Sequence, residues 1–134
     1  MGSNEKQLEI CESTQWYFSN LSALFLNCTL KRSPELPRTS GLIDIAVSIM
    51  EKCGVRTETL RPADYDIAYG VYGDMREHGW AGDDWRKIYQ QVRAADTLVL
   101  TTPIWLGEKS PLCAQVVERL FGNSADPNDE GQYA

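Results

Sequence analysis

The stretch that decides the fold is TLVLTTPIWLGEKSP, residues 97–111. It begins with an apolar run, which is typical of a strand buried on both faces. The strand then continues directly into a loop that combines prolines, a tryptophan and a glycine with little charge. A plain connector between a strand and a helix is usually short and polar. We therefore expect residues 103–107 to present a stiff, flat surface to a ligand.

Strands and helices are predicted to alternate along the rest of the chain. Strands are expected over 22–28, 55–62 and 97–103, and helices over 39–54, 83–96 and 110–122. The residues between 63 and 82 are expected to form an irregular, tyrosine-rich loop. Alternation of this kind predicts parallel strands joined by right-handed crossovers, with helices on both faces of the sheet. The predicted fold class is therefore a three-layer α/β/α sandwich, with strand 55–62 at an edge.

Residue spacing also predicts the helix ends and the faces that the helices bury. Thr39 or Ser40 is expected to cap the first helix, and Ser110 with Pro111 to begin the third. The inward faces are predicted to be Leu42, Ile43, Ala46, Val47, Ile49, Met50 and Cys53 on the first helix, Trp85, Ile88, Val92 and Ala95 on the second, and Leu112, Val116, Leu120 and Phe121 on the third.

Length and composition limit the classes of function. A chain of 134 residues with 43% hydrophobic residues is expected to form one domain, here 16–134 after a flexible arm over 1–15. A net charge of −6 argues against a nucleic-acid or anionic membrane partner. No apolar run approaches the roughly 20 residues that span a bilayer. The first residues lack the apolar core of a signal peptide, so a cytoplasmic protein is expected.

Metal binding is not expected from the residues that usually provide it. None of the four cysteines has C-x-x-C spacing, and the single histidine, His78, has no cysteine near it in the sequence. His78 is expected to lie at the surface. Asp83 and Asp84 stand at a predicted helix start, where negative charge favours the helix dipole, so we interpret them as structural rather than metal-binding.

Two loops are expected to meet at the carboxyl edge of the sheet, where open α/β folds bind ligands. The loop after the first strand offers hydroxyl groups and a cation, and it leads into a helix amino end that suits an anion. Its candidate residues are Thr29, Lys31, Ser33, Thr39 and Ser40. The chain contains neither a nucleoside-triphosphate P-loop nor a G-x-G-x-x-G motif. The loop thus predicts either a phosphate site or simply a capped polar turn.

The second loop supplies features that suit a planar heteroaromatic ligand. Such a ligand needs apolar or aromatic walls and backbone polar groups at its edge. Trp105 can stack on a ring, and Gly107 permits close approach of the main chain. The candidate residues are Pro103, Ile104, Trp105, Leu106 and Gly107. The alternative is that Trp105 only fills a gap in the core.

The segments ALFLNCTLKRSPELPRTSGLIDIA and AADTLVLTTPIWLGEKSPLCAQVVERL resemble the flavodoxin-like family of NAD(P)H-dependent FMN reductases. The resemblance covers roughly residues 22–121 of the chain. It implies FMN, held non-covalently and reduced by NAD(P)H, which passes electrons to a flavin, a quinone or a similar small acceptor. It also implies that the first loop holds the FMN phosphate and that residues 103–107 line the isoalloxazine. No side chain is expected to act as a catalytic group.

The chain departs from the family in two respects that bear on these expectations. Asn27-Cys28-Thr29 stands where many members carry Gly-Ser after the first strand. Only three strands are predicted, whereas the family's sheet has five, so the domain is expected to be incomplete. An unpaired apolar edge at strand 97–103 would favour pairing with another chain. We therefore expect a homo-oligomer.

Three other functions are compatible with parts of the pattern. One is a flavodoxin-like electron carrier without nicotinamide chemistry. Another is a degenerate flavodoxin-like domain that serves interaction only. A phosphoacceptor receiver domain is the third, but it needs an aspartate at the end of the third strand, and this strand ends in Thr101-Thr102-Pro103.

Overall fold

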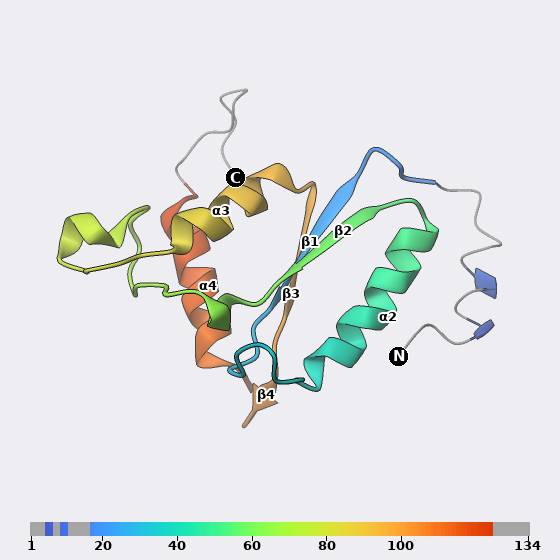
Figure 1. Cartoon of the computed structure of the whole chain (residues 1–134), viewed down its shortest axis with the longest axis horizontal. Coiled ribbons are helices and arrows are strands. Elements are labelled where there is room, and N and C mark those ends of the chain that lie inside the picture. The colour runs from blue at the N-terminus through green and yellow to red at the C-terminus, as the bar shows by residue number, and fades with distance from the viewer. Residues whose placement is uncertain (1–4, 7–8, 11–16, 125–134) are drawn as a thin grey trace.

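A parallel sheet of three strands forms the centre of the molecule (Figure 1). The computed structural model describes residues 5–6, 9–10 and 17–124. The sheet contains β1 (Ser22–Asn27), β2 (Arg56–Leu60) and β3 (Thr97–Thr101). Its order is β2-β1-β3, and both pairings are parallel. The predicted parallel sheet, with the second strand at an edge, is confirmed.

Helices cover both faces of this sheet (Figure 1). The helix α2 (Thr39–Lys52) lies on one face, and α3 (Trp85–Ala94) and α4 (Pro111–Gly122) lie on the other. The three predicted helices are therefore confirmed, within a few residues at their ends. Most of the predicted arm over 1–15, and the tail after residue 124, lie outside the described residues.

The central strand β1 carries the core because its side chains alternate between two buried faces. Leu24 and Leu26 pack into the cluster that contains Trp85 from α3 and Val116 from α4. Phe25 and Ala23 point to the other face, where Ile43 of α2 covers them. Burying a Leu or Phe side chain contributes about 1.5–3 kcal/mol. The uninterrupted apolar sequence of this strand thus follows from helices on both sides.

Two predicted inward residues lie at the surface instead. Leu42 is 67% exposed and Phe121 is 69% exposed. On α2, Ile43 is the buried residue at the centre of the contact, and Leu42 is rotated away from the sheet. On α4, the fully buried Arg119 takes the inward position one turn after Val116, which leaves Phe121 on the outer side. An arginine at an inward position is not expected from hydrophobic spacing.

One predicted helix cap is confirmed and the other is wrong. The Ser110 Oγ accepts a hydrogen bond of 3.0 Å from the Cys113 N–H, and Pro111 opens α4. The cap residue of α2 is Arg38, without a side-chain cap bond, rather than Thr39 or Ser40. Thr39 is already helical, and its hydroxyl donates to Asn27 at the end of β1. Thr39 therefore lies one position too far into the helix to serve as its cap.

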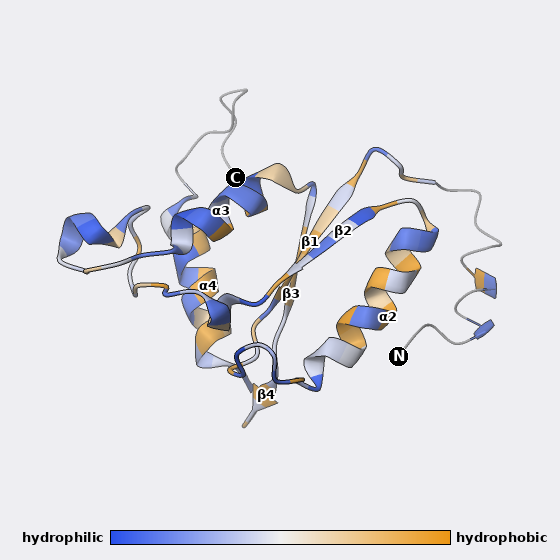
Figure 2. Cartoon of the chain, in the orientation of Figure 1, coloured by the Kyte–Doolittle hydropathy of each residue, from blue (hydrophilic) through white to orange (hydrophobic). Residues whose placement is uncertain are grey.

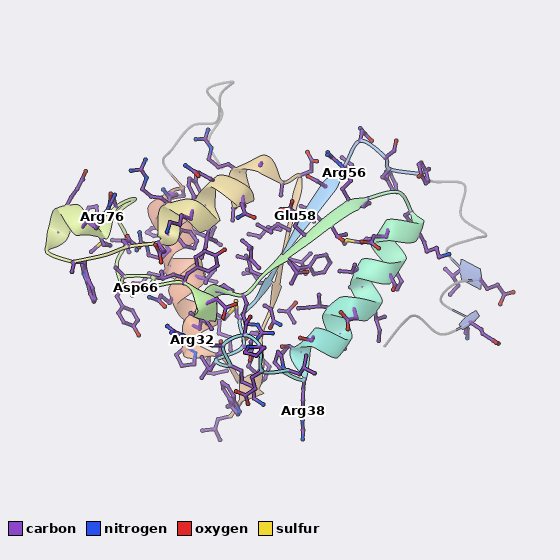
Figure 3. The ribbon with its side chains drawn as sticks, in the orientation of Figure 1. Arg32, Arg38, Arg56, Glu58, Asp66 and Arg76 are labelled. Atoms are coloured by element: carbon purple, nitrogen blue, oxygen red, sulfur yellow. The ribbon has the colours of Figure 1, made fainter. Side chains whose placement is uncertain are left out.

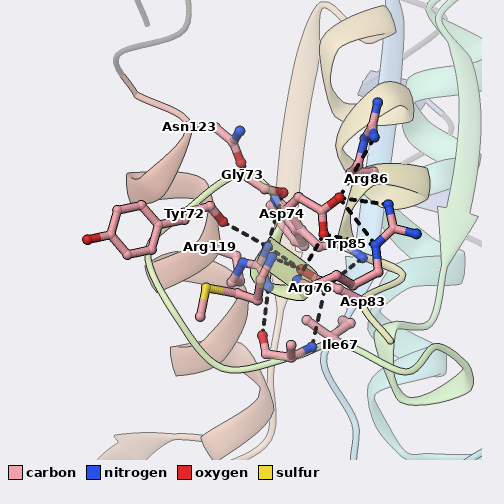
Figure 4. A network of polar contacts seen from close by, with 12 residues as sticks. Ile67, Tyr72, Gly73, Asp74, Arg76, Asp83, Trp85, Arg86, Arg119 and Asn123 are labelled. Atoms are coloured by element: carbon pink, nitrogen blue, oxygen red, sulfur yellow. Dashed lines mark hydrogen bonds and ion pairs between the residues drawn. The ribbon is translucent and has the colours of Figure 1, made fainter. Parts of the chain in front are cut away.

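The long connection between β2 and α3 contains two short 3-10 helices, η1 (Pro62–Asp64) and η2 (Met75–His78). Between them, the predicted irregular loop is confirmed. His78 lies at the surface, as expected, and stacks on Tyr72 with 4.1 Å between ring centroids. A buried ion pair between Asp83 and Arg119 fastens this connection to α4 (Figure 4).

Candidate functional site

The carboxyl ends of β1 and β3 lie side by side, and polar contacts join the two loops that follow them. The Cys28 N–H donates to the Thr101 carbonyl at 2.7 Å. The Ser110 Oγ donates to the Cys28 carbonyl at 2.8 Å, although the two residues are 82 positions apart in the sequence. Ser110 therefore connects both loops to the start of α4.

A hollow of about 420 Å³ opens between these two loops. Its size falls in the range of small-molecule sites, which is about 300–1,000 Å³. Part of its lining is apolar, and part carries hydroxyl and cationic groups. The lining residues are Thr29, Leu30, Lys31, Pro37, Arg38, Thr39, Pro103 and Trp105. The structure thus brings Trp105 to the start of α2, as the two-loop hypothesis requires.

The predicted phosphate residues divide between this hollow and a neighbouring one. Thr29, Lys31 and Thr39 line the first hollow together with Pro103 and Trp105. Ser33 and Ser40 line the second, of about 380 Å³, on the side of β2 and α2. The Ser33 hydroxyl donates to Asp64 at 2.6 Å, and its N–H donates to the other carboxylate oxygen at 2.8 Å.

Ionised groups near the first loop are paired or exposed. The Lys31 Nζ lies 3.3 Å from the Glu35 carboxylate, and both side chains are largely exposed. Arg32 and Arg38 extend from the same region near β4, and Arg38 points away from the ribbon (Figure 3). The hydrogen bonds from Ser33 hold the pKa of Asp64 below its ordinary value. Lys31 and Arg38 thus lie at the first hollow, whereas the contact between Ser33 and Asp64 lies at the second.

Cys28 follows β1 directly, but its thiol is not suited to nucleophilic chemistry. The residue is fully buried. Burial, and after it the neighbouring Cys113 thiol, raises the pKa of Cys28 to about 12. Only the thiolate is a strong nucleophile, so this thiol is inert at neutral pH. Cys28 is therefore not a candidate nucleophile.

The predicted loop at 103–107 forms a small hairpin that sequence patterns did not indicate. β4 (Ile104–Trp105) pairs in antiparallel fashion with β5 (Glu108–Lys109). Leu106 and Gly107 make the turn, and both have positive φ, 52° and 76°. Figure 2 shows hydrophobic colour on β4 at the edge of the molecule. Ile104, Leu106 and Gly107 thus build the hairpin, whereas Trp105 and Pro103 line the hollow itself.

Leu106 is in a conformation that leucine adopts only with strain, because positive φ costs an L-residue about 1–2 kcal/mol. Its side chain is also fully exposed. Asn-Gly is the preferred pair for a two-residue turn of this kind. We expect Leu106→Asn to increase the free energy of unfolding by up to about 1 kcal/mol, measured by urea denaturation.

Leu36→Asn is the matched control for this change. Leu36 is 83% exposed, but Leu106 alone among the described non-glycine residues has positive φ. The control should therefore leave stability within about 0.5 kcal/mol of wild type, as is usual for surface substitutions. An equal gain in both variants would show that backbone strain at Leu106 is not the cause.

Four further residues belong to this edge of the sheet and were not among the predicted site residues. Leu30, Pro37 and Arg38 line the first hollow, and Asn27, which lines the neighbouring one, contacts Thr29 and Thr39. Arg38 had been recognised as a cation of the first loop but was not included among the candidate site residues. Asn27 carries one signal, since a polar side chain ends an otherwise apolar strand. Leu30 and Pro37 have no distinctive pattern.

The described part of the chain lacks the features of a metal site or a membrane span. Across residues 17–124 and the two short described segments before them, no group of three or more His, Cys, Asp or Glu side chains could hold a metal ion. None of the helices described there is long and apolar enough to cross a membrane.

A parallel sheet in the order β2-β1-β3, with helices on both faces and a ligand-sized hollow at its carboxyl edge, defines a flavodoxin-like α/β fold. The family model of NADPH-dependent FMN reductases matches residues 21–130. The chain belongs to this family.

Two curated relatives share substantial identity with the chain. An 8-demethyl-8-aminoriboflavin-5'-phosphate synthase of Streptomyces davaonensis is 39% identical over 105 residues, which are 75% of this chain and 41% of the synthase. A divalent metal cation transporter, MntH, of Mycobacterium bovis is 53% identical over 117 residues, which are 87% of this chain but 17% of the transporter. The chain thus spans less than half of either relative.

A solved structure supports the fold assignment directly. The crystal structure of RosB with a bound intermediate, 8-demethyl-8-formylriboflavin-5'-phosphate, superposes with a TM-score of 0.71 at 37% sequence identity. The match covers 84% of this chain and 46% of the RosB chain.

Proposed function

We propose that this chain forms the FMN-binding part of an oxidoreductase that uses NAD(P)H to reduce a flavin, a quinone or a similar small acceptor. The observation that carries the proposal is the hollow where Thr29, Lys31 and Thr39 meet Pro103 and Trp105. These residues offer a hydroxyl donor and a cation to a phosphate, and an aromatic side chain to a ring.

The lining residues fit FMN in size and in chemistry. The lining includes hydroxyl and cationic groups, which suit a phosphate, and apolar and aromatic side chains, which suit a flavin ring. When bound, FMN would supply the ability to accept and release a hydride. Thr29 and Lys31 would bind the phosphate, and Trp105 with Pro103 would orient the ring and exclude water from one side of it. In this proposal the protein positions the cofactor and supplies no catalytic side chain.

The relatives support a flavin phosphate as the ligand. The synthase and the RosB complex are both named after riboflavin 5'-phosphate derivatives. The same names favour a second candidate, in which the flavin phosphate is a substrate that the protein modifies rather than a cofactor that it keeps. An interaction-only role is a further alternative, since the transporter relative contains the matched segment as 17% of its length.

An anaerobic titration with FMN and NADPH tests these candidates. We expect the purified protein to bind FMN, with the visible absorbance of the flavin shifted on binding. NADPH should then bleach this absorbance, and FMN should be recovered unchanged after reoxidation. Recovery of a chemically altered flavin, detected by mass spectrometry, would favour the substrate candidate. Bound flavin that NADPH does not bleach would favour an electron carrier, and no FMN binding would favour the interaction-only role.

Self-association through β3 is part of the same proposal. Among the described residues, β3 pairs with β1 on one side only, and Leu100 is 36% exposed. An apolar strand with an unpaired edge favours pairing with another strand.

A further inference from the structure

Asn27 lines the neighbouring hollow and contacts Thr29 of the first loop and Thr39 and Ser40 at the start of α2. It ends β1 and is 3% exposed. Its Oδ1 accepts hydrogen bonds from the Thr39 hydroxyl at 2.7 Å and from the Thr29 N–H at 3.3 Å. Its Nδ2 donates to the Ser40 Oγ at 3.4 Å. A backbone N–H can only donate, so the contact with Thr29 fixes which side of the amide carries the oxygen.

These contacts decide which hydroxyl groups can donate to a ligand. A hydroxyl has a single proton to donate. Thr39 gives its proton to Asn27, and Ser33 gives its proton to Asp64. Thr29 differs, because its Oγ1 accepts from the Lys31 N–H at 3.2 Å and so keeps its own proton. Of the hydroxyls that line the first hollow, Thr29 is therefore the donor and Thr39 is not.

We propose that Asn27 is a positioning residue that makes this hollow selective for a flavin with a phosphate group. By holding the Thr29 backbone and the Thr39 hydroxyl, Asn27 fixes the loop so that the Thr29 hydroxyl and Lys31 face the phosphate. The inference rests on the proposed FMN function, and it assigns a role to the residue that departs from the family's Gly-Ser.

Asn27→Asp tests whether Asn27 lies close enough to the bound phosphate to affect it, and Asn27→Ser tests the positioning contacts themselves. Aspartate has nearly the same shape and keeps acceptors for Thr29 and Thr39, but it loses the donor to Ser40 and adds a negative charge beneath the proposed phosphate position. FMN and riboflavin share the same ring and differ in the phosphate, so the ratio of their affinities isolates the phosphate. Asn20→Asp is the matched control, because Asn20 is exposed and lies before the opposite end of β1.

The dissociation constants of FMN and riboflavin would be measured by flavin fluorescence quenching for each protein. We expect wild type to bind FMN about 10- to 100-fold more tightly than riboflavin, the range for hydrogen bonds to charged groups. Asn27→Asp should lose about tenfold in FMN affinity and leave riboflavin affinity unchanged. Asn20→Asp should match wild type. Asn27→Ser shortens the side chain that contacts Thr29 and Thr39 without adding charge, so it should also weaken FMN binding by about fivefold and leave riboflavin affinity unchanged.

The outcomes separate this inference from the proposed function. An equal loss of affinity for both flavins in the Asn27 variants would mean that Asn27 only supports the fold, and it would overturn the inference. If wild type binds riboflavin as tightly as FMN, the phosphate role is wrong while flavin binding stands. If wild type binds neither flavin, the proposed function is wrong and the inference falls with it.

Discussion

Replacing Asp83 by asparagine is expected to lower the free energy of unfolding by about 3–5 kcal/mol, the usual cost of breaking a buried ion pair by removing one partner. The side chains of Asp83 and Arg119 are both fully buried, and they meet at 2.8 Å. Without the carboxylate, the Arg119 charge would stay buried without its counter-charge. Arg119 also donates to the carbonyls of Ala68 and Tyr72, so its displacement would release the connection before α3 (Figure 4).

An amide at position 83 would also leave backbone groups without acceptors. One carboxylate oxygen accepts from the N–H groups of Ala68 and Trp85, and the other accepts from the Met75 N–H. In Asp83→Asn, the amide nitrogen would replace one of the two oxygens. It would then point a donor at a backbone N–H group that needs an acceptor. Asp84→Asn is the matched control, because Asp84 pairs with the exposed Lys87, and an exposed pair contributes about 0–1 kcal/mol.

The acid dependence of stability gives a second measurement for Asp83. Burial alone would raise its pKa, but the hydrogen bond from Arg119 and the backbone N–H groups outweigh burial and lower it below the ordinary value of 3.8. A carboxyl group with a lowered folded pKa stabilises the fold above its unfolded pKa, and this contribution is lost as pH falls through the folded pKa. We expect urea denaturation to show a shallower loss of stability below about pH 4 in Asp83→Asn than in wild type. Identical pH profiles would contradict the ionised pair.

The fold could be predicted from the sequence where local physics decides it. The non-alternating strand Ser22–Asn27 requires two covered faces, and the Ser110-Pro111 pair begins a helix by its own chemistry. The Asp83–Arg119 pair could not be predicted in this way, because its members are 36 residues apart and have no periodic signal. Asp83 at a helix start resembles an exposed dipole partner, and a helical arginine resembles a surface residue.

In the candidate site, too, some features follow from local sequence and others only from tertiary contacts. Thr29 follows β1, and Pro103 and Trp105 follow β3. Because these strands are parallel neighbours, their carboxyl ends lie at one edge of the sheet, and the meeting of the two loops could be predicted. The direction of each hydroxyl proton depends on partners such as Asn27 and Asp64, whose positions arise only from tertiary packing. The hairpin at Ile104–Lys109 was missed because Leu106 at a turn position contradicts the usual turn residues.

Replacing Trp105 by alanine is expected to weaken FMN binding by about 10- to 100-fold, since stacking of a heteroaromatic ring on an aromatic side chain contributes about 1–3 kcal/mol. Trp105 is 51% exposed and lines the hollow beside Thr29 and Thr39. A half-exposed indole loses little folding energy when truncated, so the effect should appear in affinity rather than in stability. Fluorescence titration with FMN and urea denaturation would measure the two quantities separately.

Trp80→Ala provides the matched control, because Trp80 is 43% exposed but lies on the connection between β2 and α3. It should bind FMN like wild type. Trp105→Phe keeps an aromatic ring and should therefore retain most of the FMN affinity. If Trp105 only filled a gap in the core, the smaller phenylalanine would lower stability and not affinity. Unchanged FMN affinity in Trp105→Ala would mean that the hairpin does not contact the ring. The flavin would then have to lie elsewhere along the sheet edge, and the pairing of the two loops in one site would be wrong.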